Sequence, residues 1–307
     1  MAVEPYGLIL RNNLAGADLR DLCRLADERG LGVWVNDGGR GVDPFVLLGA
    51  AAALTDRATL GTAVLLLPLR HPVLIARSAL TLDGMSGGRL VLGAGVGGER
   101  PADFEAAGVR KEERGARADE AIEILRALWA GGPVSHRGRF FAFSDLQLQA
   151  PAVQPVLPIW IGGRMGGEGR SRDAALRRTA RTGDGWFPYQ VTPEQFAAGA
   201  ERLRAYWTEA GRGGTPETAL VQFICIDDDP VRARETAIRA QSRSYGIDFT
   251  PYVDRYVITG TPETCAARIA AYRAAGVGHL IFNWACDAAD VPRTAQRLVD
   301  EVLPRVQ

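Results

Sequence analysis

The sequence predicts a (β/α)8 TIM barrel, in which eight parallel strands alternate with helices, as one domain over residues 1–307. Residues 59–98 read as strand, helix and strand, which together make one parallel, right-handed βαβ unit. The same alternation continues along the chain until eight strands are counted. A length of 307 residues is ordinary for one such barrel and too long for a small α/β sandwich.

Eight short apolar runs are the expected strands. Their nearly continuous apolar character predicts a sheet that is buried on both faces, as parallel sheets are. The runs cover residues 6–10, 32–36, 60–67, 89–95, 157–162, 185–188, 219–226 and 279–283.

Helical spacing and end signals place the helices between these strands. Asp43, Thr192 and Thr261 precede helices as expected N-caps, and Gly30 follows the first helix as its stop. Residues 136–155, after strand 4, read as a hairpin and loop, and residues 245–258, after strand 7, as a second insertion. The expected helices cover residues 18–29, 44–54, 73–85, 111–129, a stretch that ends near 182, 193–210, 231–243, 262–275 and 290–302.

Composition excludes several classes of function for this protein. Thirty-six basic and 36 acidic side chains balance, which disfavours a broad nucleic-acid or membrane footprint. No apolar run reaches the roughly 18 residues of a membrane span, and residues 1–5 show no signal peptide. The four cysteines form no CxxC pair and the three histidines are far apart, so we expect no metal site and reduced thiols in a cytoplasmic protein.

In a (β/α)8 barrel, functional residues gather at the carboxyl ends of the strands. Asp37 follows the second strand, where it suits proton transfer or contact with a ligand, although Asn-Asp-Gly-Gly is also a common turn. Glu99 is the best second carboxylate, with a solvated loop charge as the alternative. Arg11, Trp186 and Trp284 suit a small organic substrate, the two indoles as a flat apolar wall, and core packing is the alternative for both.

Glycines at two strand ends point to an anionic ligand. Gly95 and Gly97 end the fourth strand, where the backbone can approach a ligand closely. Gly162 and Gly163 end the fifth strand ahead of a helix, and free backbone N–H groups there favour a phosphate. Arg164 follows them as a candidate anion contact, although a tight turn and a solvated arginine are the plainer interpretations.

Four stretches, in the same order, resemble the bacterial luciferase-like family of flavin- and deazaflavin-dependent oxidoreductases, and among them most closely the branch that uses coenzyme F420. They are GTAVLLLPLRHPVLIARSALTLDGMSGGRLVLGAGVGG at 61–98, ERGARADE at 113–120, PIWIGGR at 158–164 and GDGW at 183–186. The resemblance covers most of residues 1–190 and weakens beyond.

The resemblance implies a cofactor ring over the third strand at Thr62, Ala63 and Val64, with a cis peptide between Ala63 and Val64. It implies hydride transfer to or from an organic substrate with F420, or oxygen insertion through a flavin peroxide with FMNH2. Relatives often have a histidine after the residue that matches Asp37, whereas this chain has glycine. A separate cofactor reductase and a homodimer are further implications. A flavin-binding protein without turnover remains the alternative outside enzymes, while no GxSxG motif supports a hydrolase.

Overall fold

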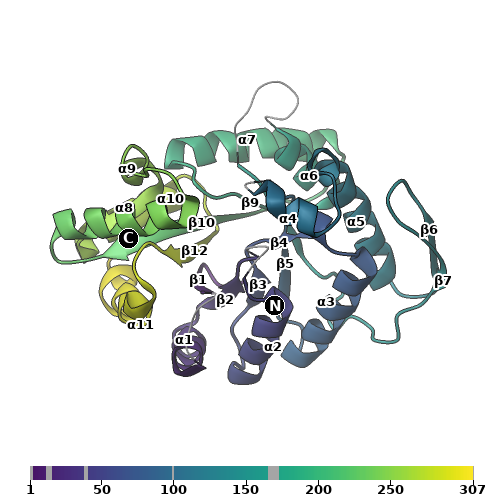
Figure 1. Cartoon of the computed structure of the whole chain (residues 1–307), viewed down its shortest axis with the longest axis horizontal. Helices are drawn as coiled ribbons and strands as arrows, with labels where there is room; N and C mark the ends of the chain where they lie inside the picture. Colours follow the sequence, from purple (N-terminus) through teal and green to yellow (C-terminus); the bar gives the residue numbers. More distant parts are fainter. Residues whose placement is uncertain (1–2, 12–15, 38–40, 99, 165–172, 307) are drawn as a thin grey trace.

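The computed structural model describes residues 3–11, 16–37, 41–98, 100–164 and 173–306. In Figure 1 the strands lie in the middle and the helices surround them. Neighbouring strands of the barrel pair in parallel. Their order is β10, β12, β1, β2, β3, β5, β8 and β9, and β9 pairs in turn with β10, so the barrel is closed. The predicted (β/α)8 barrel is therefore confirmed. Its strands are β1 (Tyr6–Leu10), β2 (Gly32–Val35), β3 (Leu60–Thr62), β5 (Leu90–Gly95), β8 (Ile159–Gly162), β9 (Gly185–Phe187), β10 (Glu217–Ile226) and β12 (His279–Trp284).

The predicted helices are all present, with ends that differ by a few residues. Asp43 and Thr192 accept hydrogen bonds from backbone N–H groups of the first turns that follow them, as expected of N-caps. Gly30 has a φ of +66°, the left-handed conformation of a helix stop. The helices are α1 (Gly16–Arg29), α2 (Pro44–Leu54), α3 (Pro72–Ser86), α4 (Pro101–Ala106), α5 (Arg114–Trp129), α6 (Ala174–Thr182), α7 (Pro193–Glu209), α8 (Pro230–Tyr245), α9 (Val253–Tyr256), α10 (Pro262–Ala274) and α11 (Val291–Arg297).

The third strand differs from the single run expected over residues 60–67. It stops at Thr62, and a two-residue strand β4 (Leu65–Leu66) follows and pairs only with β5. The Ala63–Val64 peptide bond between the two pieces is cis, as the resemblance implied. Hydrophobicity alone could not show the break, because both pieces are apolar.

Both insertions are present. After β5, an antiparallel hairpin of β6 (Val134–Arg137) and β7 (Ala142–Leu146) lies outside α5, where the Glu120 carboxylate accepts bonds from the backbone N–H groups of Phe140 and Phe141. After β10, the chain forms α9 and a further parallel strand, β11 (Val257–Gly260), on the edge of β10. The sequence analysis missed β11 because its four residues carry no strand period, and it missed the short helices α4 and α9.

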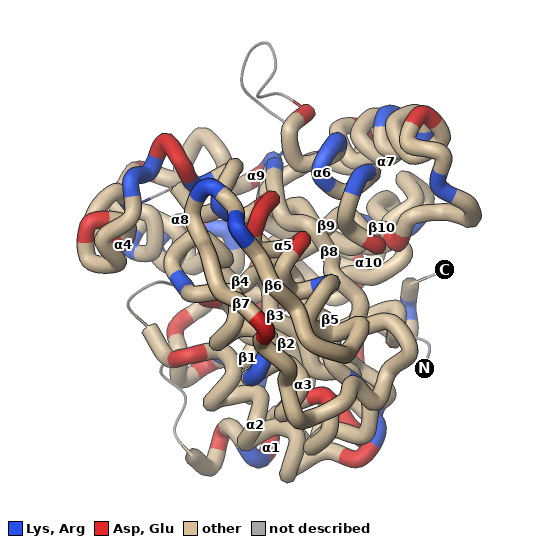
Figure 2. Tube along the Cα trace, turned by 90° about the vertical axis from the view of Figure 1, so that its right-hand side faces the viewer, with Lys and Arg blue, Asp and Glu red and all other residues tan. Residues whose placement is uncertain are grey.

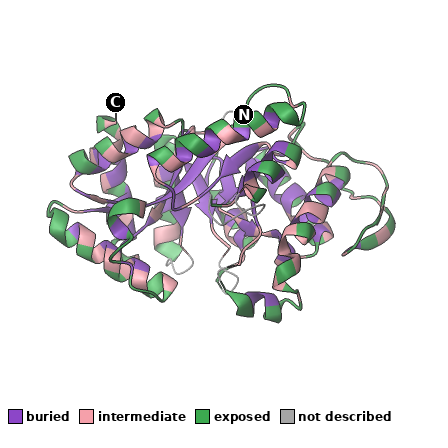
Figure 3. Cartoon of the chain, turned by 90° about the horizontal axis from the view of Figure 1, so that it is seen from above, coloured by how far each residue is buried: buried purple, intermediate pink, exposed green. Residues whose placement is uncertain are grey.

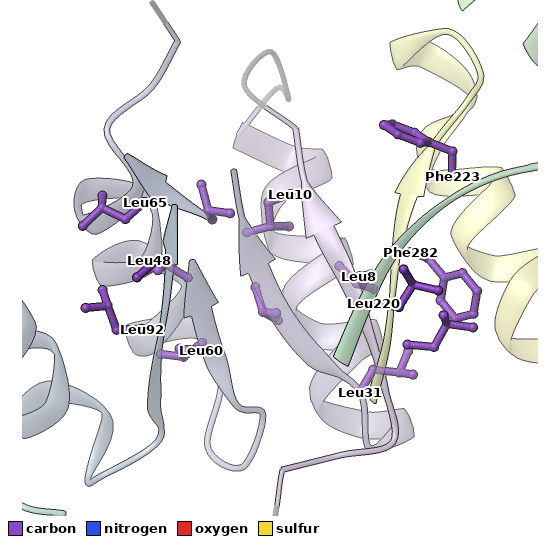
Figure 4. Close-up of a cluster of buried hydrophobic side chains, with 14 of the residues drawn as sticks. Leu8, Leu10, Leu31, Leu48, Leu60, Leu65, Leu92, Leu220, Phe223 and Phe282 are labelled. Carbon is purple, nitrogen blue, oxygen red and sulfur yellow. The ribbon is translucent and has the colours of Figure 1, made fainter. Parts of the chain in front are cut away.

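Two apolar cores lie on opposite sides of the strands. The larger fills the space between strands and helices, and Figure 4 shows Leu60, Leu65 and Leu92 of the strands beside Leu48 of α2. The smaller fills the barrel, where Trp34 and Trp160 stack with ring centroids 5.3 Å apart. Figure 3 shows the strands buried and the outer helix faces exposed. Within the described residues, no helix is long and apolar enough to cross a membrane.

Polar contacts tie down the amino ends of the strands. The buried Arg89 guanidinium, just before β5, donates to backbone carbonyls of Ser86, Thr55 and Ala58. Arg126 of α5 pairs with Asp184 at 2.5 Å, and Asp184 also accepts from the first backbone N–H of β8. These contacts fix the starts of β5 and β8 to the segments around them.

Candidate functional site at the carboxyl ends of the strands

Alternation along each strand decides which side chains face the barrel axis. Trp34 and Ile281 belong to the core inside the barrel, so Asn36 and Asn283, two residues further along, face the same way at the open end. Val64 and Tyr189 pack on this inner core from above. The side chains of Asn36, Asn283, Val64 and Tyr189 are partly exposed, whereas the inner core beneath them is buried. They form the lining of a mouth at the carboxyl ends of the strands.

Aromatic side chains close the barrel below this mouth. Trp34 and Trp160 each meet Phe187 edge to face, with ring centroids 5.2 and 5.7 Å away. Glycines make room for them: a Cβ on Gly61 would lie 2.2 Å from the Trp34 ring, and one on Gly7 would lie 2.5 Å from it. A ligand can therefore lie across the strand ends but cannot enter the barrel.

Val64 sits against two of the predicted glycines. A Cβ on Gly95 would lie 2.3 Å from Val64 Cγ2, and one on Gly162 would lie 2.9 Å from Val64 Cγ1. These two glycines leave room for the isopropyl group of Val64, which is partly exposed at the mouth. Contact of Gly95 and Gly162 with a ligand stays a prediction. Thr62 points elsewhere, since its buried hydroxyl donates to the Gly93 carbonyl at 2.7 Å.

Asp37 lies at the edge of the mouth in a charged network. Its backbone N–H donates to the Val64 carbonyl, and its Oδ2 accepts from Leu66 N at 3.2 Å and from Arg70 Nε and a terminal nitrogen at 3.3 and 3.2 Å. Arg70 also pairs with Asp43, the N-cap of α2, at 2.5 Å. The Asp37 side chain is only 5% exposed. The network shows that the Asp37 carboxylate is ion-paired with Arg70. Proton transfer by Asp37 and contact of Asp37 with a cofactor ring both stay predictions.

The charges in this network support one another. Burial works against the charge of Arg70, but the hydrogen bond from Arg70 to Asp43 and the charges of Asp37 and Asp43 outweigh it and raise the pKa of Arg70. Burial likewise opposes ionisation of Asp43, yet the bond and charge of Arg70 and the N–H groups of α2 lower the pKa of this carboxyl. Both groups are therefore charged at neutral pH.

Arg164 lies at the ends of β8 and β9. Its guanidinium lies 4.9 Å from the centre of the Tyr189 ring and donates to Gln190 Oε1 at 2.9 Å. The side chain is exposed, so it can also reach an anion in solvent. Gly163, beside it, packs on α6, where an added Cβ would lie 2.5 Å from Ala175 Cβ. The rest of the predicted phosphate loop, 165–172, lies outside the described residues.

Two of the three predicted substrate contacts, Trp186 and Trp284, lie away from the mouth, whereas Arg11 follows Ile9 of the inner core by two residues at the carboxyl ends of the strands. Trp186 and Trp284 are fully buried and face the helices, because their strand neighbours Phe187 and Asn283 face inward. Trp186 stacks on Phe196 of α7. Arg11 donates to the Trp284 and Cys286 carbonyls and so holds the end of β12. Core packing, the alternative weighed for the tryptophans, is what this placement favours.

The remaining predicted positions follow β5. Gly97 has a φ of +65° and lies against Leu66 and Phe104 of α4, so it forms part of the rim. Glu99 and Gly38 lie outside the described residues. Among the described residues, no group of histidine, cysteine, aspartate and glutamate side chains is placed to hold a metal ion.

The sequence did not predict the part that several residues play at the mouth. Asn36 and Arg70 follow the second and third strands and were expected near the carboxyl ends, but neither was given a role, and Gln190 was not predicted. Phe223, 8% exposed, belongs to the larger core and meets Tyr245 of α8 edge to face, with ring centroids 6.4 Å apart. Counting two residues upward from Trp34 and Ile281 of the inner core leads to Asn36 and Asn283. No local pattern predicts that Arg70 reaches Asp37, because 33 positions separate them.

A separate hollow of about 690 Å³ lies away from this mouth, between α5, the hairpin and α6. Its walls carry both signs of charge, including Glu123, Arg137 and Arg181, and Figure 2 shows that both signs are interspersed over the outer helices. One of its carboxylates, Glu120, is hydrogen-bonded to the hairpin backbone and to His136. The hollow is therefore part of the hairpin's attachment to the barrel, and the mouth remains the candidate site.

Comparison with known families agrees with this geometry. Residues 9–279 match the model of the luciferase-like monooxygenases. The chain belongs to this family. It is thus a member of an oxidoreductase family, as the four sequence stretches indicated.

Individual relatives span different parts of the chain. An uncharacterized protein of Mycobacterium tuberculosis is 34% identical over 199 residues, which is 65% of this chain and 66%, slightly under two thirds, of that protein. An F420-dependent glucose-6-phosphate dehydrogenase of Nakamurella multipartita is 28% identical over 95% of this chain and 93% of its own. The crystal structure of monooxygenase RslO1 from Streptomyces bottropensis superposes with a TM-score of 0.84 at 26% identity, covering 98% of this chain and 99% of its own.

Proposed function

We propose that this protein is an F420-dependent oxidoreductase that transfers a hydride between the deazaflavin ring and a small organic substrate. The observation that carries the proposal is the apolar surface of Val64, held over Gly95 and Gly162 in the middle of the mouth. The similarity to an F420-dependent dehydrogenase along nearly the whole chain supports the choice of F420.

The mouth fits a flat ring with polar edges. Ala63 and Val64 offer an apolar face, and the side chains of Asn36, Asn283 and Asp37 stand at its margin. Arg164 is exposed at one end, where an anionic cofactor tail would lie. A flat heterocycle that carries a phosphate is therefore compatible with the side chains present.

Bound here, the deazaflavin would supply or accept the hydride. The chain would do the rest. Val64 would set the height of the ring above the strand ends, and Asp37 would hold its edge. The aromatic layer of Trp34, Trp160 and Phe187 closes the barrel beneath and keeps water from that side.

The second candidate is a monooxygenase that uses reduced FMN. The whole-chain match to the structure of a monooxygenase favours it, because the barrel is shared at 26% identity. This function would need a separate reductase to supply reduced flavin. We infer that the flavin ring of FMN would contact the same apolar Val64 surface as the ring of F420. The two candidate functions therefore differ in the cofactor and not in the place where it binds.

Fluorescence titration of the purified protein separates these functions. We expect micromolar or tighter binding of F420 and weaker binding of FMN, each tested oxidised and, without oxygen, reduced. Preference for reduced FMN, with a peroxide absorbance when oxygen is admitted, would instead support the monooxygenase. If neither cofactor binds at micromolar concentration, the oxidoreductase proposal is wrong and a protein without turnover is left.

We also propose a homodimer through the outer face of α2 and α3. Residues 44–54 contain no charged side chain, and Val46 is 75% exposed there. Leu74 and Met85 of the neighbouring α3 are each 57% exposed. Sedimentation of Val46→Glu should show a monomer where the unaltered protein is a dimer; two identical profiles would contradict this interface.

We also propose that the protein works in the cytoplasm. Its four buried free thiols suit a reducing compartment.

A further inference from the structure

We propose that Arg70 is a positioning residue of this site, which acts on the bound cofactor through Asp37. The inference rests on the proposed function, since it assumes a ring over Val64. It assigns a task to an arginine that pairs with Asp37 and Asp43 beside the mouth.

The geometry of the contact fixes the carboxylate. Arg70 places two nitrogens, Nε and a terminal one, on the same oxygen of Asp37, and the Leu66 backbone N–H reaches that oxygen from a third direction. Three donors that converge on one oxygen leave little freedom for rotation of the group. Asp37 therefore keeps one orientation at the edge of the mouth.

The same contact replaces backbone bonds that the third strand lacks. Because the strand breaks after Thr62, β4 pairs with β5 but not with β2. The Asp37 carboxylate bridges this gap from the end of β2 to Leu66, while its backbone N–H holds the Val64 carbonyl. The position of Val64, and so of any ring above it, depends on Asp37.

Arg70 has a firm anchor of its own. Its other terminal nitrogen pairs with Asp43 at 2.5 Å, and Asp43 is fixed as the N-cap of α2 through two backbone N–H groups. The chain of contacts thus runs from a helix start, through Arg70, to the carboxylate at the mouth. A purely structural arginine would need no partner at the site.

A double-mutant cycle on cofactor affinity tests this role. Arg70→Met and Asp37→Asn should each weaken F420 binding by about tenfold, and the double variant should bind no more weakly than Asp37→Asn alone. Losses that multiply in the double variant would overturn the proposal, because Arg70 would then act independently of Asp37. Arg70→Lys should recover part of the affinity, since it keeps the charge but not the two-nitrogen contact.

Arg126→Met is the matched control. Arg126 makes the same kind of pair with Asp184 at nearly the same exposure, 29% against 28% for Arg70, but at the amino ends of the strands. Both methionine variants should lower the unfolding temperature, and only Arg70→Met should weaken binding. Equal effects on binding would show that Arg70 is merely structural. If the unaltered protein binds neither F420 nor FMN, the proposed function fails, and this inference fails with it.

Discussion

The two ends of the barrel hold their charged groups for different purposes. At the amino ends, Arg89 gives its donors to backbone carbonyls and a hydroxyl and is 6% exposed, so no group is left for a ligand. At the carboxyl ends, the charged network borders a mouth lined by partly exposed side chains. The buried arginine therefore lies at one end and the proposed ligand site at the other, as is usual in (β/α)8 barrels.

The largest effect should come from the amino end. Arg89→Met leaves several buried carbonyls without their donor, so we expect a loss of about 3 kcal/mol in the free energy of unfolding. Denaturant unfolding measures it, and F420 affinity of the folded variant should stay within about twofold of the original. A large loss of affinity with little loss of stability would break the comparison.

At the carboxyl ends, Gly95→Ala should act on both properties. The new Cβ would lie 2.3 Å from Val64, so Val64 must move, at a cost of about 1–3 kcal/mol in stability. F420 affinity should fall clearly, in contrast to Arg89→Met. Fluorescence titration beside denaturant unfolding checks this, and unchanged affinity would remove Val64 from the ring contact.

Gly49 of α2 lies outside the polar networks at both ends of the barrel and serves as a reference for them. Nothing lies within 4 Å of a Cβ placed on Gly49 in α2. Gly49→Ala should therefore stabilise the protein by up to about 1 kcal/mol through helix propensity, without a change in affinity. A loss of stability would contradict this expectation and indicate that Gly49 is packed against a second copy of the chain, which sedimentation would detect.

The smallest effect is a pH dependence at the amino end. The hydrogen bond with His279 lowers the pKa of Glu217 from its ordinary 4.5, against the opposing effect of burial. A lowered pKa adds stability above the unfolded pKa, and this stability is lost as the pH falls through the folded value. The unfolding temperature of Glu217→Gln should thus lie slightly below that of the original protein at pH 6, and the difference should disappear once the pH falls below the lowered pKa of Glu217. Because Glu217 is 57% exposed, the difference should be small.

Much of the fold could be read from local sequence. The eight strands, the caps at Asp43 and Thr192 and the stop at Gly30 depend on residues a few positions apart, and all were predicted. The strand β11 was missed because it is a short edge strand that exists by pairing with β10. The close approach at Gly95 and Gly162 was predicted, but the contact of both glycines with Val64 was not.

Side-chain direction and distant pairing came only from the tertiary structure. A parallel barrel strand is buried on both faces, so apolar runs do not reveal that Trp186 faces the helices and Phe187 the axis. The approach of Arg70 to Asp37 likewise depends on closure of the barrel, which brings residues 33 positions apart within 3.3 Å. By itself the sequence determined the order and ends of the elements, because these follow from short-range periodicity and capping. Packing around the closed sheet decided which residues meet at the mouth.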